Sequence, residues 1–305
     1  MAINKRNADY TLKYNPRSLY PLVDDKLRTK QLAQVNGIAV PDLYAVIEVP
    51  GQVRTLPERL KEHTDFVIKP AHGSGGEGIL VISERLNGRL RKPDGVIITW
   101  DELNHHILNV LSGLYSLGGQ PDQALVEYYV QFAPVFEKIS YQGVPDIRII
   151  VFMGVPVMSM VRLPTRMSDG KANLHQGALG AGIDMATGTT LTAVLGNEIV
   201  TDHPDTGHPV TGVTIPYWDD LLKLAARCFE LTGLGYQGVD IVLDRDKGPL
   251  ILELNARPGL NIQIANNAGL LLRLELVERC HRELQTVEER VTFAKCHFDA
   301  AGAGL

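Results

Sequence analysis

The sequence predicts an α+β protein, in which antiparallel hairpins alternate with amphipathic helices. Residues 146–163 and 237–255 each read as two strands joined by a tight turn. Residues 216–234 instead repeat apolar side chains at helical spacing. With 305 residues, 45% of them hydrophobic, the chain is long enough to bury a sizeable core and to divide into two or three lobes.

The remaining elements follow from local signals. Helical spacing predicts a short helix within 24–41, which Gly37 and Pro41 end. Thr99 and Glu102 form a capping box that opens another helix. The other expected elements are two strands around a glycine loop at 66–82, a strand in "QALVEYYV", a turn near Gly154, a polar loop at 167–182 and a last helix near 269–295.

The composition argues against several classes of protein. The net charge of −5 gives no whole-chain attraction to nucleic acid, so we expect no nucleic-acid partner. The cysteines are widely spaced and form no CxxC pair, which favours reduced thiols over a disulfide framework or a zinc site. No apolar run approaches the roughly 18 residues of a membrane span. We therefore expect a cytoplasmic protein without membrane insertion.

The stretch "FVIKPAHGSGGEGILVI", residues 66–82, combines a lysine at a strand end with a glycine-rich loop. A Walker A loop requires its lysine after the glycines, whereas Lys69 precedes them. The dinucleotide fingerprint requires a helix after the loop, whereas "GILVI" alternates like a strand. The pattern favours a strand–loop–strand flap whose backbone amides can approach an anion. A surface hairpin with a flexible tip is the alternative.

The hairpin "GVDIVLDRDKGPLILELNARPG" places acidic side chains together. If "RDKG" is a four-residue loop, Asp244 pairs with Pro249 and Asp240 lies opposite Glu253. Asn255 then shares their face, and two carboxylates with an amide oxygen suit Mg²⁺. The other face carries the apolar set Val239, Ile241, Leu243, Leu250, Leu252 and Leu254. The alternative is a solvated polar face, and a one-residue slip in register would break the pairing.

With Lys26, Lys69 and this acidic set, the chain resembles the ATP-grasp carboxylate–amine ligases, most closely the alpha-L-glutamate ligase-like proteins. The resemblance covers most of residues 20–265. It implies an ATP-grasp fold of two α+β lobes that grip ATP between antiparallel sheets, with a reduced N-terminal lobe. The implied division is 1–50 for the N-terminal segment and reduced lobe, 51–130 for the small lobe with the flap, and 131–305 for the large lobe with the metal site and a C-terminal helix.

The same resemblance assigns roles to individual residues. It implies ATP contacts from Lys26, Lys69, His72, Gly73, Ser74, Gly75, Gly76, Gly78, Glu127, Tyr128, Tyr129, Val130, Asp146 and Lys171. It implies Asp240, Glu253 and Asn255 as ligands of Mg²⁺, with Mn²⁺ as the alternative ion. Lys171, Arg148 and Arg257 would offset charge during catalysis. From the residues alone, Arg257 could be a structural arginine, Arg148 a cross-strand ion pair and Lys26 an exposed helix lysine.

The implied activity is an ATP-dependent ligase that forms an amide or peptide bond through an acyl phosphate, with glutamate or another amino acid and a peptide or small-molecule acceptor. Residues 84–122 and 185–215 are longer than that pattern. The segment "DHPDTGHPVTGVTIPYWDD" instead resembles the sugar-transfer-associated ATP-grasp proteins. Two alternatives follow: a ligase or kinase acting on a glycan or cell-envelope precursor, and a nucleotide-binding protein without catalysis. A homo-oligomer stays open.

Overall fold

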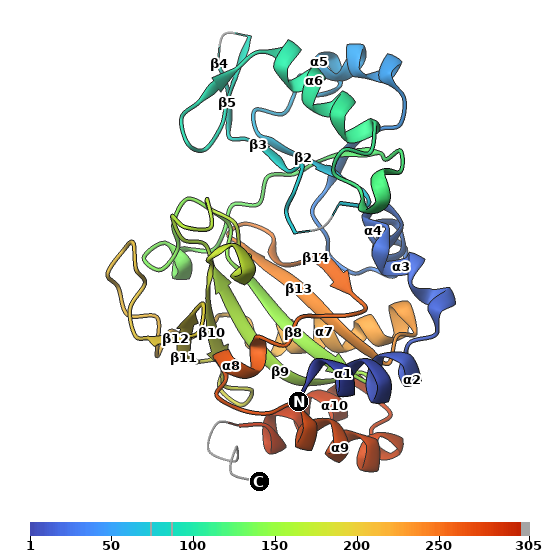
Figure 1. Cartoon of the computed structure of the whole chain (residues 1–305), viewed down its shortest axis with the longest axis vertical. Helices are drawn as coiled ribbons and strands as arrows, with labels where there is room; N and C mark the ends of the chain where they lie inside the picture. The colour runs from blue at the N-terminus through green and yellow to red at the C-terminus, as the bar shows by residue number, and fades with distance from the viewer. Residues whose placement is uncertain (74, 87, 300–305) are drawn as a thin grey trace. The chain divides into compact units, whose positions relative to one another are not determined.

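The computed structural model describes residues 1–73, 75–86 and 88–299. Two compact units make up the chain. The large unit consists of Met1–Asp24, Arg28–Val40 and Gln131–Leu305, and the small unit consists of Asp25–Leu27 and Pro41–Val130. Each unit is built on its own antiparallel sheets with helices, so the α+β prediction is confirmed (Figure 1). The division into 1–50, 51–130 and 131–305 stays a prediction.

The small unit centres on a four-stranded antiparallel sheet. Its order is β1 (Leu43–Ile47), β7 (Ala124–Glu127), β2 (Phe66–Pro70) and β3 (Leu80–Ile82). A second sheet holds β4 (Glu84–Leu86), β5 (Arg89–Arg91) and β6 (Ile97–Ile98). The helices of this unit are α5 (Leu56–Arg59) and α6 (Trp100–Leu111). The predicted strands on both sides of the glycine loop are therefore confirmed.

Helix α6 covers the core of the small unit. The helix begins after Thr99. The Thr99 hydroxyl oxygen accepts a hydrogen bond from the Glu102 amide, and the Glu102 carboxylate accepts one from the Thr99 amide, as the capping-box pattern predicts. Its side chains Leu103 and Ile107 are fully buried with Phe66 of β2. Apolar burial along this helix therefore holds it against the sheet that carries the loop.

The large unit is built on a seven-stranded antiparallel sheet. Its order is β12 (Glu198–Val200), β11 (Thr190–Leu195), β10 (Leu179–Ile183), β9 (Val155–Leu163), β8 (Asp146–Phe152), β13 (Tyr236–Asp244) and β14 (Gly248–Asn255). The helices are α1 (Ile3–Lys5), α2 (Leu12–Tyr14), α3 (Pro21–Asp24), most of α4 (Lys26–Val35), α7 (Trp218–Thr232), α8 (Ile262–Ala265), α9 (Leu271–Cys280) and α10 (Val287–His297).

The two faces of this sheet have different cover. Helix α7 packs on β8, β9 and β13 and buries one face (Figure 1). The first residues of the chain cover one end of the other face, where Tyr14 and Tyr10 meet the ring of Phe152 at 4.9 and 5.5 Å between centroids. Alternation along β8 puts Phe152 on the same face as Asp146 and Arg148. The charged strand ends therefore belong to the face that α7 does not cover.

Two predicted elements differ from the structure. The polar loop predicted over 167–182 ends earlier, because Leu179 already pairs with Leu163 as β10 begins. The single last helix is instead two helices, α9 and α10. Thr286 and Glu289 form a second capping box that starts α10 afresh, so the chain turns between the two helices.

The three cysteines, Cys228, Cys280 and Cys296, are all free thiols, and burial raises the pKa of Cys228. Within the described part of the chain, no helix has the length and apolar character needed to cross a membrane.

Candidate functional site

A row of charged side chains crosses four neighbouring strands of the large unit. Arg162 of β9 lies opposite Asp146 of β8, and Arg148 of β8 lies opposite Asp240 of β13. Asp240 in turn lies opposite Glu253 of β14, as the sequence predicts. Directly opposed residues on paired strands share a face. The sheet register alone therefore brings these five side chains together.

Short ion pairs join the row. Arg148 donates from Nε and Nη2 to the two carboxylate oxygens of Asp240, at 2.7 and 2.6 Å. Arg162 donates to Asp240 Oδ2 at 2.8 Å and pairs with Asp146 through two further bonds. Asp240 is only 1% exposed. Such bidentate, buried pairing fixes each carboxylate in one orientation.

The two aspartates of this row respond to it in opposite ways. Burial alone would raise the pKa of Asp240, but the Arg148 and Arg162 guanidiniums outweigh burial and hold that pKa well below its usual range. Burial raises the pKa of Asp146, with Arg162 opposing and the charge of Asp240 adding to the effect. Asp240 therefore keeps its negative charge at neutral pH.

The predicted opposition of Asp240 and Glu253 arises by a different route from the one expected. The turn is one residue shorter than predicted, because Asp244 pairs with Gly248 and Leu243 with Pro249. A bulge at Leu252 then shifts the register by one. The shorter turn and the bulge offset each other, so Asp240 lies opposite Glu253 as predicted.

The bulge also corrects the predicted apolar face. Leu252 is only half-buried and lies outside the core cluster, whereas its neighbours Ile251 and Leu254 are fully buried within it. A bulged residue leaves the ladder unpaired and interrupts the alternation of faces. Leu252 therefore does not face the core as predicted.

Glu253 and Asn255 complete the predicted ligand set. Both are half-buried, and Asn255 donates from Nδ2 to Asp240 at 3.2 Å, so its Oδ1 is the atom that could bind a cation. Within residues 1–73, 75–86 and 88–299, no group of three or more His, Cys, Asp or Glu side chains could hold a metal ion. The set has only two carboxylates and one amide. This donor chemistry fits Mg²⁺, which binds through one or two carboxylates and completes its shell with water and phosphate oxygens.

The two remaining cations predicted for the large unit lie outside the row. The guanidinium of Arg257 is exposed and sits 5.4 Å from the ring centroid of Tyr20. Lys171 is half-buried in the loop before β10, where its backbone amide bonds to the carbonyl of Ser168. Their catalytic roles stay predictions.

The two lysines predicted to contact ATP, Lys69 and Lys26, both bond to other residues of the small unit. Lys69 forms a buried ion pair with Glu127 at 2.6 Å, with 8% and 3% of the two side chains exposed. Glu127 is opposite Val67, so the pair is a diagonal contact between β2 and β7. Lys26 donates from Nζ to the carbonyl of Gly73 at the start of the glycine loop.

The first turn of the glycine loop is bonded to a buried carboxylate that the sequence did not single out. The backbone amide of His72 donates to both oxygens of Asp122, at 3.2 and 3.1 Å. Nδ1 of the same histidine lies 2.7 Å from Asp122 Oδ1, and the Ser116 hydroxyl donates to Oδ2 at 2.6 Å. Asp122 therefore anchors this end of the loop.

The far end of the loop rests on helix α6 and the turn that follows it. His106 lies 2.9 Å from the carbonyl of Gly78 through Nε2. A Cβ at Gly78, whose φ is +73°, would come within 2.6 Å of the Tyr115 ring, so only glycine fits there. Gly75 and Gly76 also have positive φ. Ser74, a predicted ATP contact, lies outside the described residues.

The predicted hinge residues leave strand β7 in sequence. The amide of Tyr128 bonds to the carbonyl of Asp42 at 2.9 Å, Tyr129 is half-buried with its pKa raised by burial, and Val130 is buried. Their contact with adenine stays a prediction.

The family described as sugar-transfer-associated ATP-grasp matches residues 5–279. The chain belongs to this family. Among curated proteins it is 24% identical over 277 residues to a probable alpha-L-glutamate ligase of Xylella fastidiosa (strain M12), covering 91% of this chain and 69% of that protein. It is 26% identical over 236 residues to a probable alpha-L-glutamate ligase of Klebsiella pneumoniae (strain 342), covering 77% of this chain but only 56% of that protein.

Among solved structures, D-cycloserine synthetase DcsG aligns with a TM-score of 0.49 and 17% identity, over 87% of this chain and 73% of that one. The match to the family model confirms the predicted resemblance to ATP-grasp proteins, and the matching family is the one indicated by the segment at 202–220. Magnesium and ATP are the cofactors typical of ATP-grasp ligases.

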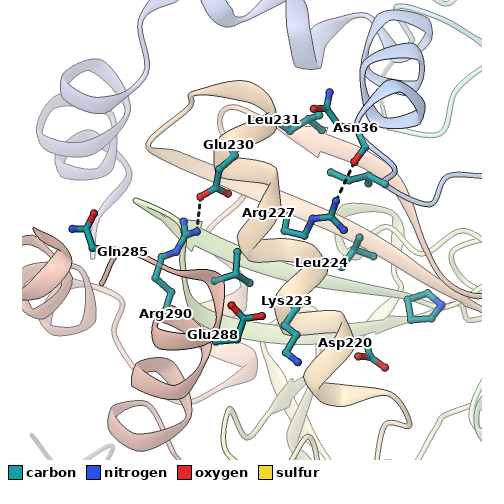
Figure 2. A pocket seen from close by; sticks show the side chains of 13 residues that line it. Asn36, Asp220, Lys223, Leu224, Arg227, Glu230, Leu231, Gln285, Glu288 and Arg290 are labelled. Carbon is teal, nitrogen blue, oxygen red and sulfur yellow. Dashed lines mark hydrogen bonds and ion pairs between the residues drawn. The ribbon is translucent and has the colours of Figure 1, made fainter. Parts of the chain in front are cut away.

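The large unit of this ATP-grasp chain also holds a pocket of about 810 Å³. Figure 2 shows its charged lining on α7 and α10, where Arg227 bonds to the carbonyl of Asn36 and Arg290 pairs with Glu230. Of the residues that the structure describes, none of those predicted for the site lines it. Because its best-buried cation is already neutralised by a carboxylate, we assign it no ligand.

Sequence reasoning missed two side chains, Arg162 in the charged row of the large unit and Asp122 at the glycine loop of the small unit. Counting back from the turn at Gly154 would place Val161 opposite Asp146, but a bulge at Val157 moves Arg162 there. Nothing in a hairpin count reveals such a bulge. Asp122 precedes strand β7, and its contacts with the glycine loop span 50 residues of sequence, so local patterns do not reveal them.

Proposed function

We propose that this chain is an ATP- and Mg²⁺-dependent ligase that joins a carboxylate to an amine through an acyl phosphate. The observation that carries the proposal is the opposition of Asp240 and Glu253, with Asn255 on the same face, in a chain of the ATP-grasp family. The relatives named as glutamate ligases support glutamate or another amino acid as one substrate. A peptide or small molecule would be the acceptor.

Asp240, Glu253 and Asn255 would hold the metal ion, which would neutralise the phosphate charge when bound. Arg148 and Arg162 influence this ligand set through their bonds to Asp240. They hold its carboxylate ionised and in one orientation, and that ionised form is the one a cation requires. With Arg148 and Arg162 against Asp146, Asp240 and Glu253, the row carries one net negative charge. That surplus attracts a cation.

Charge on the transferring phosphoryl group would be offset by this chain's own cations. Lys171 stands in the loop before β10, and Arg257 follows the ligand strand within two residues of Asn255. A guanidinium can bind a carboxylate or an acyl phosphate through two parallel bonds. We assign Arg257 to the substrate carboxylate or its phosphate, and Lys171 to the nucleotide phosphates.

ATP would be held by the strand end and loop of the small unit. Lys26 supplies positive charge, Lys69 stands at the strand end in its ion pair with Glu127, and the glycine loop from His72 to Gly78 supplies backbone amides. Catalysis by positioning and charge neutralisation is the general pattern of phosphoryl transfer, since the protein makes few covalent bonds itself.

A second candidate substrate class has its own support. The family is described as associated with sugar transfer, and the segment at 202–220 led to the same group from sequence alone. We therefore retain a glycan-linked or cell-envelope precursor as an alternative acceptor, with ATP and metal used in the same way.

The decisive experiment measures ATP binding and its consequences separately. Calorimetry should show ATP binding with Mg²⁺ that weakens sharply when EDTA is added, and equal binding without metal would contradict the site. ADP release should then be measured with each amino acid, with sugar-linked amines and with hydroxylamine. Trapping of a hydroxamate supports the acyl phosphate. ATP binding without amine-dependent phosphate release would instead indicate a nucleotide-binding protein without catalysis.

A further inference from the structure

We propose that Asp122 is a positioning residue that fixes the glycine loop for nucleotide binding, and that it acts through His72. This inference rests on the proposed function, because the loop matters only if it covers a nucleotide. Asp122 itself would not touch ATP.

Asp122 joins the start of the loop to two other segments of the small unit. Its side chain is fully buried, and it accepts from the His72 amide, the Ser116 hydroxyl and the Gln123 amide, with His72 Nδ1 at 2.7 Å. Gly73 forms a β-bridge with Ser116, which ties the next residue to the same turn. These bonds lower the pKa of Asp122 although burial acts in the other direction.

An ionised carboxylate only accepts hydrogen bonds, so His72 must donate from Nδ1 to Asp122. The histidine tautomer is thereby fixed, although 46% of the His72 side chain is exposed. A carboxylate oxygen of Asp25 lies 3.8 Å from Nε2. The ring and the backbone of His72 are therefore both held by one carboxylate.

Such an anchor matters because the loop beyond it resists ordering. Gly75, Gly76 and Gly78 adopt positive φ, and glycine loses more conformational freedom on fixing than any other residue. The loop is held at one end by Asp122 and at the other by His106. An anchored first turn reduces the entropy that nucleotide binding must still remove, and this gain appears as affinity.

Two substitutions of His72 separate positioning from direct contact. Asparagine places its amide nitrogen close to the position of Nδ1, whereas glutamine places its amide nitrogen close to that of Nε2. If His72 acts by bonding to Asp122, His72→Asn should retain most of the ATP affinity of the wild type. His72→Gln should instead bind ATP as weakly as His72→Ala.

The test compares Asp122→Asn, His72→Ala and the double variant with the wild type. The matched control is Asp94→Asn, which changes an exposed aspartate that accepts the amide of Val96 in another turn of the small unit. Calorimetry should show ATP bound about tenfold more weakly by Asp122→Asn, the effect expected from losing one charged hydrogen bond. Adding His72→Ala should cost little more, because the bond between the imidazole and the carboxylate is already lost in Asp122→Asn. Asp94→Asn should bind as the wild type does.

Hydrogen exchange without nucleotide gives a readout that does not depend on catalysis. Backbone amides of the loop should exchange faster in Asp122→Asn than in Asp94→Asn, while the amides of β2 and β7 keep their protection. If the wild type binds ATP and Asp122→Asn or His72→Ala binds it equally well, the positioning role is wrong. If the wild type itself binds no ATP, the proposed function fails instead, whatever the exchange data show.

Discussion

The charged row of the large unit and the glycine loop of the small unit achieve precision in different ways. In the row, each side chain stands on a strand, and the register of β9, β8, β13 and β14 decides its neighbours. In the loop, the backbone follows glycines with positive φ, and a few side chains from distant segments hold its ends. Strand pairing therefore fixes the side chains of the row, whereas hydrogen bonds to distant side chains fix the ends of the loop.

The difference has a thermodynamic consequence. The row lies between β-ladders and is largely buried, so altering it disturbs buried charges and costs stability. The loop is attached at its ends, so loosening it changes local order more than global stability. Variants in the two regions should therefore separate stability from ligand binding, and the following predictions test that separation from the largest effect to the smallest.

Removing the shared cation should have the largest effect on stability. Arg162 pairs with both Asp146 and Asp240, and Arg162→Met leaves two buried carboxylates short of a partner. Breaking a buried ion pair in this way costs about 3–5 kcal/mol. The free energy of unfolding in urea measures it. Arg282→Met, which changes an exposed arginine, should alter the free energy of unfolding little. An equal loss in both variants would show that the ion pairs of the row add no more stability than an exposed arginine does.

The bulge in β14 predicts a contrast between neighbouring leucines. Leu254 is 1% exposed in the core cluster, so Leu254→Ala should cost about 2–5 kcal/mol through the cavity it leaves. Leu252 is half-buried at the bulge, so Leu252→Ala should cost clearly less. Urea unfolding of both variants checks this. If the two alanines cost the same, the faces alternate regularly and the bulge is absent.

The two hairpins show how far the sequence could lead. Alternating apolar residues were enough to predict the strands and which of them form each hairpin, but the predicted register was correct at Asp240 and Glu253 only because two differences cancel there. The bulges at Val157 and Leu252 were not predictable, because they depend on how the strands pack rather than on local propensity. Because the bulge at Val157 was not predicted, Arg162 was not recognised as the partner of Asp146. The bulge at Leu252 offsets the turn that is one residue shorter than predicted, so Asp240 still lies opposite Glu253.

The glycine loop was predictable in kind but not in its attachments. A strand-end lysine followed by glycines predicted a strand–loop–strand flap, and β2 and β3 confirm those strands. The anchor at Asp122 depends on a contact between segments 50 residues apart. Single-sequence patterns describe short ranges, so such tethers become visible only once the chain is folded.

Glu253→Gln should affect activity without unfolding the protein. Loss of one anionic metal ligand should lower the turnover of ATP at least about a hundredfold, the order observed when a single transition-state stabiliser is removed. Stability should change little, because Arg148 and Arg162 already neutralise Asp240 opposite. Steady-state ADP release and urea unfolding measure the two effects. Glu198→Gln, on an exposed strand, is the matched control, and unchanged turnover in Glu253→Gln would remove the metal-site proposal.

The smallest effect should come from the loop anchor in acid. Hydrogen bonds from Ser116 and His72 lower the pKa of Asp122 in the folded state, against the effect of burial. A folded pKa below the unfolded value of about 3.9 means that the ionised carboxylate adds stability above that pH. This contribution is lost as the pH falls through the folded pKa.

Asp122→Asn removes that titration, so its stability should fall less steeply than that of the wild type as the pH drops below the unfolded value of about 3.9. Urea unfolding at several pH values, followed by a probe in the small unit, measures the slope. If the free energy of unfolding decreased equally with falling pH in Asp122→Asn and in the wild type, the charge of Asp122 would contribute nothing to folding. The weaker ATP binding expected of Asp122→Asn would then have to arise from geometry alone, which would sharpen the contrast with the row, where charge and stability are inseparable.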